Sequence, residues 1–576
     1  MKISVSQYIV DYLKLRGVSK VFELSGGMIM HLIDSLEQAA DIDVVNVYHE
    51  QSGAFAADAV GRLTGKAGVA LGTSGPGAIN LLTGVGSSFF DSSPTVFITG
   101  QVNRHEQKGE QPIRQLGFQE TDIVAMVKPI TKWALKLTEP EQILGALPKA
   151  FDVAESGRPG SVLLDIPMDI FRAEIEVPSL EFPEDTSSSQ QPSTEDIYEL
   201  LNALRSAKKP LILAGAGIRA AGAATEFCQF VEQSEIPVVT SLLGLDILPA
   251  SHPLRVGMIG TYGNRWANLA IANSDLLLVL GSRLDIRQTG AITEFFTENR
   301  KVIHVDIEAA EMNNRVKGCQ AIHADLKAFF KAIGDQAPSL AGKTQPWLQE
   351  INDLRQKWPH TEELQNVNGI NPNDFIHQLS NGRQAAAYCI DVGLHQMWSA
   401  QSLQLPENCR FLTSGGMGSM GFALPAALGS AFTYGNQQPI VMIAGDGGFQ
   451  VNIQELQSVQ HHQLPIKMIV LNNHCHGMTR QFQDTYFGAR YAGTYWGYST
   501  PDFSKVAAAY AIESKRISQV SETKSAIDWL WEDPLKPQLL EVDIDMKVNS
   551  YPKIAFGKPI SEMEPHASPV QMGETR

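Results

Sequence analysis

Short apolar runs rich in β-branched residues alternate with helical stretches along nearly the whole chain. Parallel strands need a long return connection, usually a helix, so this alternation favours parallel sheets covered by helices. The runs fall into three groups, at residues 41–49, 67–74, 95–100 and 161–167, then 210–217, 237–241, 275–282 and 301–307, then 386–393, 410–416, 439–447, 466–473 and 537–545. We therefore expect an α/β protein with three doubly wound parallel-sheet domains.

Two stretches without a clear apolar period separate the three groups. Residues 182–194 (FPEDTSSSQQPST) are polar and rich in serine and proline, and residues 334–372 are mixed and partly helical. Stretches of this composition are typical of linkers between domains. We expect domains over 1–180, 190–345 and 365–550, followed by a tail over 551–576. A length of 576 residues suits this division at ~100–200 residues per domain.

Charge and composition exclude several classes of protein. The net charge of −16 argues against a nucleic-acid binder, which needs a basic face. The five cysteines are scattered without paired spacing, as in a reduced cytosolic enzyme. Neither a signal peptide nor an apolar run of the ~18 residues that a membrane span needs is visible. We expect a cytoplasmic enzyme without nucleic-acid or membrane partners.

The segment over 439–478 contains the strongest chemical signal. It reads as a strand, a glycine turn, a helix and a second strand. Gly445, Gly447 and Gly448 let the backbone approach a ligand, and the following helix offers free N–H groups to a phosphate. Asp446 and Asn473 end successive strands, and their oxygens, with a carbonyl from the next loop, suit a hard cation. The segment predicts a metal–diphosphate site.

GDG, 24 intervening residues (448–471) and Asn472-Asn473 form a specific pattern. It resembles the Mg²⁺ and diphosphate motif of thiamin-diphosphate (ThDP) enzymes. The stretch VYHEQSGAFAADAVGRLTG (47–65) places Glu50 between a strand and a helix built of small residues. By itself this fits an acidic helix N-terminus. With the resemblance, Glu50 matches the glutamate that bonds the cofactor's aminopyrimidine and acts as its general acid and base.

Ordered blocks along nearly the whole chain resemble the acetolactate (acetohydroxyacid) synthases. They include SGGMIMHLIDSL, FITGQV, GFQETDIV, PGSVLLDIPMDI, GSRLDIRQTG and TSGGMGSMGFALPAALG. The resemblance implies a pyrimidine-binding, an FAD-binding and a diphosphate-binding domain, in that order. It also implies a homodimer or homotetramer, because two subunits share each cofactor.

The resemblance assigns roles to individual residues. Gly418 and Met420 would bind and bend the cofactor, Asp446, Asn473 and the Cys475 carbonyl would hold Mg²⁺, and Phe118 and Gln119 would face the reacting carbon. Further residues expected to contact ThDP are Gly27, Gly393, His395, Gln396, Gly445, Gly447, Gly448 and Met478. His461 and His462, in the helix after GDG, are expected on the solvated surface.

The middle domain is expected to bind FAD in a structural role. A glycine pair after a strand, Gly215 and Gly217, is by itself equally consistent with a simple tight turn. The resemblance adds Gly281, Arg283, Arg287, Asp306 and Asp325 to the flavin-binding set. Arg287 also matches the arginine that receives the carboxylate of the second keto acid, a pairing that suits a guanidinium.

Four residues depart from the family pattern. Lys128 stands where an arginine usually contacts FAD, and Leu394 replaces a glutamine near the diphosphate. Met28 and Phe482, both expected on the substrate side with Arg287, replace an alanine and a tryptophan. The donor half of the site therefore follows the family more closely than the acceptor half.

The predicted activity is a ThDP- and Mg²⁺-dependent carboligation. Pyruvate is decarboxylated, and its two-carbon unit is transferred to a second 2-keto acid. An alternative acceptor is a ketone such as a 4-keto-deoxy nucleotide sugar, which Met28, Phe482 and the tail segment 552–565 motivate. Lesser alternatives are a pyruvate oxidase, a plain decarboxylase and a non-catalytic nucleotide binder; the last would be expected to lack Glu50, Asp446 or Asn473.

Overall fold

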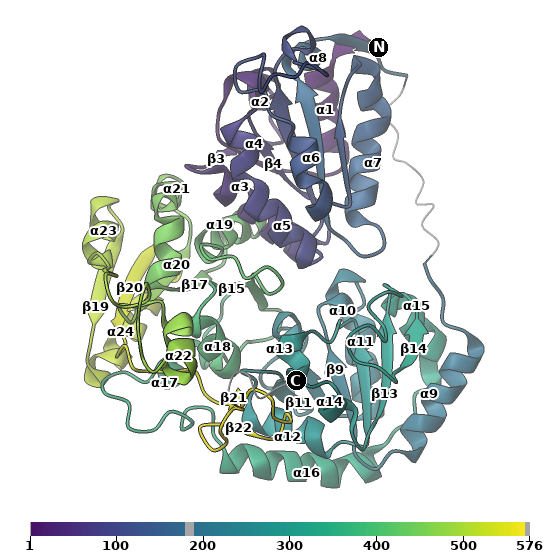
Figure 1. The fold of residues 1–576 in the computed structure, drawn as a ribbon, viewed down its shortest axis with the longest axis vertical. Helices are drawn as coiled ribbons and strands as arrows, with labels where there is room; N and C mark the ends of the chain where they lie inside the picture. Colours follow the sequence, from purple (N-terminus) through teal and green to yellow (C-terminus); the bar gives the residue numbers. More distant parts are fainter. Residues whose placement is uncertain (1, 179–188, 571–576) are drawn as a thin grey trace.

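The computed structural model describes residues 2–178 and 189–570. The chain forms three α/β domains, each built on a six-stranded parallel sheet with helices on both faces (Figure 1). The predicted fold class is confirmed. Over the described residues, none of the helices combines the length and the apolar character needed to cross a bilayer.

The N-terminal sheet has the strand order β3-β2-β4-β5-β7-β6. Its strands are β2 (Lys20–Glu23), β3 (Asp43–Asn46), β4 (Gly68–Gly72), β5 (Thr95–Gln101), β6 (Trp133–Lys136) and β7 (Ser161–Pro167). Its main helices are α1 (Val5–Leu15), α2 (Met30–Glu37), α3 (Glu50–Thr64), α5 (Leu82–Phe90) and α7 (Ile143–Glu155). A short antiparallel pair, β1 (Lys2–Ser4) and β8 (Glu174–Glu176), joins the two ends of this domain.

The middle sheet has the order β11-β10-β9-β12-β13-β14. Its strands are β9 (Pro210–Ala214), β10 (Val238–Thr240), β11 (Arg255–Met258), β12 (Leu276–Leu280), β13 (Lys301–Asp306) and β14 (Gln320–His323). Its main helices are α9 (Thr194–Ser206), α11 (Ala224–Ser234), α12 (Arg265–Asn273), α15 (Leu326–Ile333) and α16 (Ala341–Lys357).

The C-terminal sheet has the order β16-β15-β17-β18-β20-β19. Its strands are β15 (Ala387–Ile390), β16 (Arg410–Thr413), β17 (Ile440–Gly445), β18 (Ile466–Asn472), β19 (Glu513–Ile517) and β20 (Gln538–Asp543). Its main helices are α17 (Pro372–Ser380), α18 (Leu394–Ser402), α19 (Ala423–Thr433), α20 (Asp446–Val451), α21 (Leu456–His461), α22 (Gly477–Tyr486), α23 (Phe503–Ala509) and α24 (Val520–Glu532).

Near the middle of each sheet the strand order reverses, and ligands of doubly wound sheets bind beyond the strand ends at such a point. The reversal lies between β2 and β4, between β9 and β12, and between β15 and β17. These strands end next to Gly27, Gly215, Gly281, Gly393 and Asp446. The topology therefore brings residues predicted for the three ligand-binding halves to the three switch points.

Helix α3 joins the N-terminal domain to the C-terminal domain by packing against α19 (Figure 1). A Cβ added to Gly429 of α19 would lie only 2.3 Å from the carbonyl oxygen of Ala56. Ala54, on the same helix, would lie 2.2 Å from a Cβ added to Gly84 of α5. The small residues after Glu50 thus permit close helix packing, as the sequence indicated.

The C-terminal tail packs on the middle domain. Its two short strands, β21 (Lys553–Ile554) and β22 (Met563–Glu564), pair with each other, and Ile554 N–H donates to the Thr261 carbonyl at 2.7 Å. Ile554, Ile560 and Met563 are buried in the core formed around α12 and α16.

Candidate active site

Glu50 is held in a fixed orientation at the first turn of α3. Its side chain is largely buried, with 6% of the residue exposed. Asn80 Nδ2 donates a 2.9 Å hydrogen bond to Oε2. The other oxygen, Oε1, would lie 3.2 Å from a Cβ on Gly77, so a side chain there would displace the carboxyl group. Asn80 was not predicted from the sequence.

Gln119 lies over the turn that follows β4, the same turn that contacts Glu50. Its backbone has φ 67°, a left-handed conformation that is uncommon outside glycine. A Cβ on Gly75, in this turn, would lie 3.0 Å from the Gln119 Cβ. Its neighbour Phe118 is 78% exposed, and therefore free to meet a ligand or a second protein surface.

Gly27 and Met28 lie at the end of the neighbouring strand β2, in the 3₁₀ turn η1 (Gly27–Ile29). Met28 N–H donates to Thr73 Oγ1 at 3.4 Å, which ties this turn to the one after β4. The structure therefore brings Gly27, Met28, Glu50 and Gln119 to one edge of the N-terminal sheet.

Asp446 and Asn473 end the adjacent strands β17 and β18, and both are buried. Burial raises the pKa of Asp446 to about 7, and its Oδ2 has no hydrogen-bond partner. A buried carboxylate oxygen without a hydrogen-bond partner fits the role of a cation ligand. No three Asp, Glu, His or Cys side chains cluster as a ready metal site in the described part of the chain. A cation here would need oxygens from its ligand, as in a diphosphate complex.

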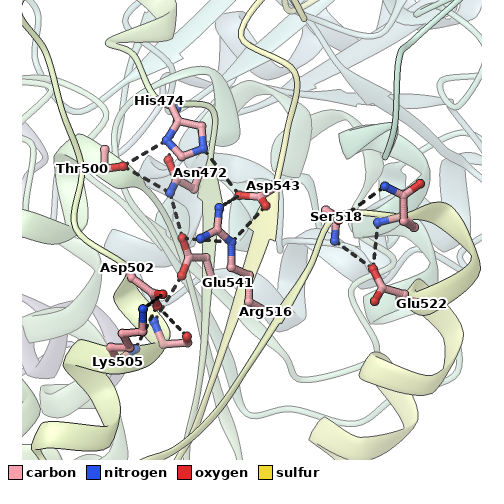
Figure 2. Close-up of polar contacts among 12 residues, drawn as sticks. Asn472, His474, Thr500, Asp502, Lys505, Arg516, Ser518, Glu522, Glu541 and Asp543 are labelled. Atoms are coloured by element: carbon pink, nitrogen blue, oxygen red, sulfur yellow. Dashed lines mark hydrogen bonds and ion pairs between the residues drawn. The ribbon is translucent and has the colours of Figure 1, made fainter.

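The loop that carries Asn473 and Cys475 is anchored on a polar network at the ends of β18 and β20 (Figure 2). Asn472 donates to Glu541 Oε1 at 2.8 Å, and its own Oδ1 accepts from His474 N–H at 3.1 Å. The His474 ring contacts Thr500 at 3.0 Å and Asp543 at 3.5 Å. Burial raises the pKa of the Cys475 thiol to about 11, so the thiol stays protonated. The backbone carbonyl oxygen of Cys475 is therefore the group suited to bind a hard cation.

A cradle of glycines surrounds His395 at the start of α18. Cβ atoms on Gly393 and Gly445 would lie 2.6 and 2.7 Å from its ring. Burial lowers the pKa of His395 to about 3, so the imidazole is neutral, and its Nε2 is unpartnered. An orphan imidazole nitrogen beside two tight glycines fits a diphosphate oxygen as its partner.

Asp391, which was not predicted, fixes the other side of this cradle. Its carboxylate accepts from the backbone N–H groups of Val392, Gly421 and Ala423. A Cβ on Gly448 would lie 2.5 Å from its Oδ1. Asp391 therefore fixes the position of the segment around Gly448 relative to the segment that follows Met420.

Gly418 and Met420 lie in the loop after β16, where Gly418 has φ 70°. Met420 is 37% exposed, whereas Met478, on α22, is partly buried against the C-terminal core. Gln396 donates to Thr413 Oγ1 at 2.7 Å, which links the cradle to the start of this loop.

The predicted flavin-binding residues line one cavity of about 1090 Å³. This is the upper end of the ~300–1,000 Å³ range of ordinary ligand pockets, so a large ligand fits. Of the predicted set, its walls contain Gly217, Gly281, Arg283, Arg287, Asp306 and Asp325. Gly215 packs beneath the cavity, since a Cβ there would lie 2.1 Å from the Gly281 carbonyl. Lys128 is exposed in the turn η3 (Lys128–Ile130).

Three family models match consecutive parts of the chain: "Thiamine pyrophosphate enzyme, N-terminal TPP binding domain" over residues 3–126, the central domain over 197–333 and the C-terminal TPP binding domain over 391–542. The acetolactate synthase large subunit of Lactococcus lactis is 36% identical over 564 residues, covering 97% of this chain and 96% of its own. The chain belongs to the acetolactate synthase family of thiamine pyrophosphate enzymes.

Two more members of this family show the same extent of similarity. The isozyme 2 large subunit of Escherichia coli is 36% identical over 570 residues, with 97% of this chain and 98% of its own covered. The large subunit of Cyanidium caldarium is 35% identical over 573 residues, with 96% and 95% covered.

The residues predicted for the acceptor side come from different elements. Arg287, in α13 (Ile286–Thr289), points across the domain boundary, and its Nη2 lies 3.4 Å from Gln396 Oε1. Phe482 of α22 is 42% exposed and stacks with Tyr486 and Phe487, at ring distances of 4.8 and 5.8 Å. Leu394 is buried and would contact a Cβ on Gly477.

The predicted surface position of two histidines is correct for only one of them. His461, which ends α21, is exposed. His462 is half-buried, with its ring 5.1 Å from that of Phe432. Burial, with His461 beside it, lowers the pKa of His462. His462, directly after the helix, packs toward Phe432, and the prediction of two surface histidines did not anticipate this.

Proposed function

We propose that this protein decarboxylates pyruvate and transfers the resulting two-carbon unit to a second 2-keto acid. One observation carries the proposal. A buried, hydrogen-bonded glutamate on one domain, Glu50, and a buried carboxylate with a free oxygen on another, Asp446, each lie at a switch point of a ThDP-enzyme fold. The names of the relatives, acetolactate synthases, support the same activity.

The residues fit ThDP, Mg²⁺ and FAD, which we propose as cofactors. Asp446, Asn473 and the Cys475 carbonyl would hold Mg²⁺, and the ring N–H of the neutral His395 would donate a hydrogen bond to the diphosphate. Bound ThDP supplies a thiazolium ring that accepts the electron pair released when CO₂ leaves pyruvate. The walls of the large cavity, with Arg283, Asp306 and Asp325, suit a flavin dinucleotide in a structural role.

The side chains of this protein would hold and move protons and orient the second substrate. Glu50 would exchange a proton with the aminopyrimidine of bound ThDP. Gln119, fixed over the Gly75 turn, would lie on the side of the reacting carbon. Arg287 pairs with the acceptor's carboxylate through two parallel hydrogen bonds, which fixes the carbonyl for attack.

We further propose that two copies of the chain form each site. Apolar side chains near the two half-sites are exposed in the single chain, namely Tyr48, Ile79, Phe90, Met417, Met420 and Val451. A second copy that covers them would supply Asp446 to the cofactor that Glu50 activates. Whether two or four chains assemble does not alter this requirement.

A ketone acceptor, such as a 4-keto-deoxy nucleotide sugar, remains a second candidate. The aromatic group of Phe482, Tyr486 and Phe487 favours it by offering apolar surface against which a sugar ring could pack. Arg287 favours a keto acid, although a guanidinium could also bind a phosphate. The test is competition: the protein with ThDP, Mg²⁺, FAD, labelled pyruvate and each acceptor in turn, with products identified by mass. Preferential acetolactate supports the proposal; preferential labelling of the sugar contradicts it.

A further inference from the structure

A buried cluster of charges links α3 of the N-terminal domain to the end of β16. The Arg62 guanidinium donates to both Asp58 oxygens, at 3.1 and 2.7 Å, and to Asp91 Oδ2 at 2.8 Å. Its Nη1 also donates to the Thr413 carbonyl at 2.7 Å. The side chains of Asp58 and Asp91 are fully buried. Removing one partner of such a cluster is costly, so the arrangement is rigid.

The loop over 414–420, which carries Gly418 and Met420, takes its backbone partners from this cluster. Asp91 accepts from the N–H groups of Gly415 and Gly416, at 3.0 and 2.6 Å. Farther along, Ser419 N–H donates to Ser414 Oγ at 3.0 Å, and that hydroxyl lies 3.1 Å from Ser87 Oγ. The N-terminal domain thus holds the start of the loop by direct hydrogen bonds, and Ser414 links this start to Ser419 near the other end.

Packing fixes the start of this loop against Asp91, whereas the side chains of Met417 and Met420 remain exposed. A Cβ on Gly416 would lie 2.8 Å from Asp91 Oδ1 and 3.0 Å from the Phe90 Cβ. One on Gly86 would lie 2.9 Å from the Met417 sulfur. A small displacement of Asp91 must therefore be transmitted to the loop rather than absorbed by free space.

The same cluster lines the large cavity. Arg62, Asp91, Gly415 and Gly416 are all among the residues of its walls. Asp91 is already buried, but Gly415 and Gly416 are partly exposed, so a ligand that fills the cavity removes water from their hydrogen bonds to Asp91. Excluding water strengthens these bonds.

We propose that Arg62 and Asp91 are positioning residues that couple occupancy of the large cavity to the conformation of the 414–420 loop. A filled cavity orders the loop, so ThDP binds to a loop that has already lost part of its conformational freedom. The proposal rests on the proposed flavin and ThDP sites. It also assigns a flavin that takes no part in redox chemistry a role in the binding of ThDP. By linkage, each cofactor must raise the affinity of the other by the same factor.

The test measures this factor on the full chain. ThDP is titrated in the presence of Mg²⁺, with tryptophan fluorescence as readout, with and without saturating FAD. We expect ThDP to bind about tenfold more tightly with FAD, in the range usual for coupled sites. The reverse titration must give the same factor. Hydrogen exchange of peptides that cover 413–421 should slow when FAD is added.

Asp91→Asn tests the two residues themselves. Arg62 keeps its pair with Asp58, so the variant should fold, which its melting curve will show. The amide has one acceptor oxygen in place of two, so it cannot accept from both Gly415 and Gly416 as the carboxylate does. We expect the coupling factor to fall to about one, since the cluster that transmits the effect is broken. Asp169→Asn is the matched control, because Asp169 also accepts from an arginine and a backbone N–H, both of Arg104, away from the loop.

Equal ThDP affinity with and without bound FAD would overturn the inference. So would a coupling factor in Asp91→Asn equal to that of the wild type. FAD retention is measured first, by absorbance after ultrafiltration. A protein that retains no flavin would refute the proposed flavin site, and this inference with it, whereas flavin binding without coupling refutes the inference alone.

Discussion

Asn80 and Glu50 are joined by a 2.9 Å hydrogen bond from Nδ2 to Oε2, which leaves the other carboxyl oxygen facing the glycine turn after β4. Two different helices, α4 (Pro76–Asn80) and α3, meet in this contact. Because the bond occupies Oε2, Oε1 is the oxygen available to a cofactor nitrogen.

Glu50→Gln keeps the shape of the side chain and removes its ability to exchange a proton. We expect acetolactate formation to fall by at least about 100-fold, the usual scale for losing a general acid–base group. ThDP affinity, measured by fluorescence, should stay within a few-fold. Turnover equal to that of the wild type would refute the role of Glu50.

Asn80→Ala removes the hydrogen bond but leaves the carboxyl group. The carboxyl group then loses its fixed orientation, and we expect a smaller loss of rate, about tenfold, from the loss of one hydrogen bond to a charged group. Steady-state rates of both variants, and of the double variant, show whether the two effects are linked. If Asn80 acts only through Glu50, the double variant will be no slower than Glu50→Gln alone.

Gly448→Ala places a methyl group 2.5 Å from Asp391 Oδ1. Asp391 is fixed by three backbone N–H groups and cannot move aside. We expect ThDP affinity to fall by at least about tenfold, equivalent to 1.4 kcal/mol. The control is Gly145→Ala on α7, where a methyl group meets nothing within 4 Å. That variant should bind ThDP normally and gain up to ~1 kcal/mol in stability. Wild-type ThDP affinity in Gly448→Ala would contradict the proposal that this glycine cradle binds the cofactor.

Acid should destabilise the cofactor-free protein through His395. Burial lowers its pKa in the folded protein to about 3, below the ordinary histidine value of 6.5. Between these values the unfolded chain binds a proton that the folded chain does not, so stability is lost as the pH falls below 6.5. His395→Asn does not titrate, and its melting temperature should fall less between pH 7 and pH 5. The exposed His105→Asn is the control. An equal fall in all three proteins would show that His395 does not contribute.

Arg287→Gln tests the acceptor. If the guanidinium binds a carboxylate, its loss should lower the ratio of acetolactate to acetaldehyde by about 10- to 100-fold, the scale of a lost charge-assisted bond. Decarboxylation itself should change little. Arg383→Gln, on the surface of the C-terminal domain, is the control. An unchanged ratio in Arg287→Gln would favour an acceptor without a carboxylate.

The sequence predicted buried strands far better than edge strands. β12, β17 and β18 are apolar on both faces, which marks a strand inside a parallel sheet, and each matches a predicted run. Four of the six edge strands, β6, β11, β14 and β19, lie outside the predicted runs. β19 (ESKRI) shows why, since most of its side chains are solvated and polar. Such a segment has no apolar run to detect.

The residues of the candidate site also fall into two groups, those that the sequence could suggest and those that it could not. Residues proposed to meet the cofactor directly, such as Asp446 and Asn473, belong to a motif with fixed spacing, so the sequence alone could suggest them. Asn80, Asp391 and Asp91 act by orienting other groups, and their partners are distant in sequence: Asp91 contacts Gly415 and Gly416 more than 300 residues away. Only the folded chain brings these pairs together, so spacing alone gave no signal for them.

The most direct test of the proposed function is carbon-13 NMR of the purified protein with ThDP, Mg²⁺, FAD and carbon-13-labelled pyruvate as the only substrate. We expect rapid appearance of acetolactate, because a second pyruvate offers both a carbonyl for attack and a carboxylate that Arg287 would bind. Acetaldehyde, or slowly formed acetoin, as the sole product would contradict the keto-acid acceptor.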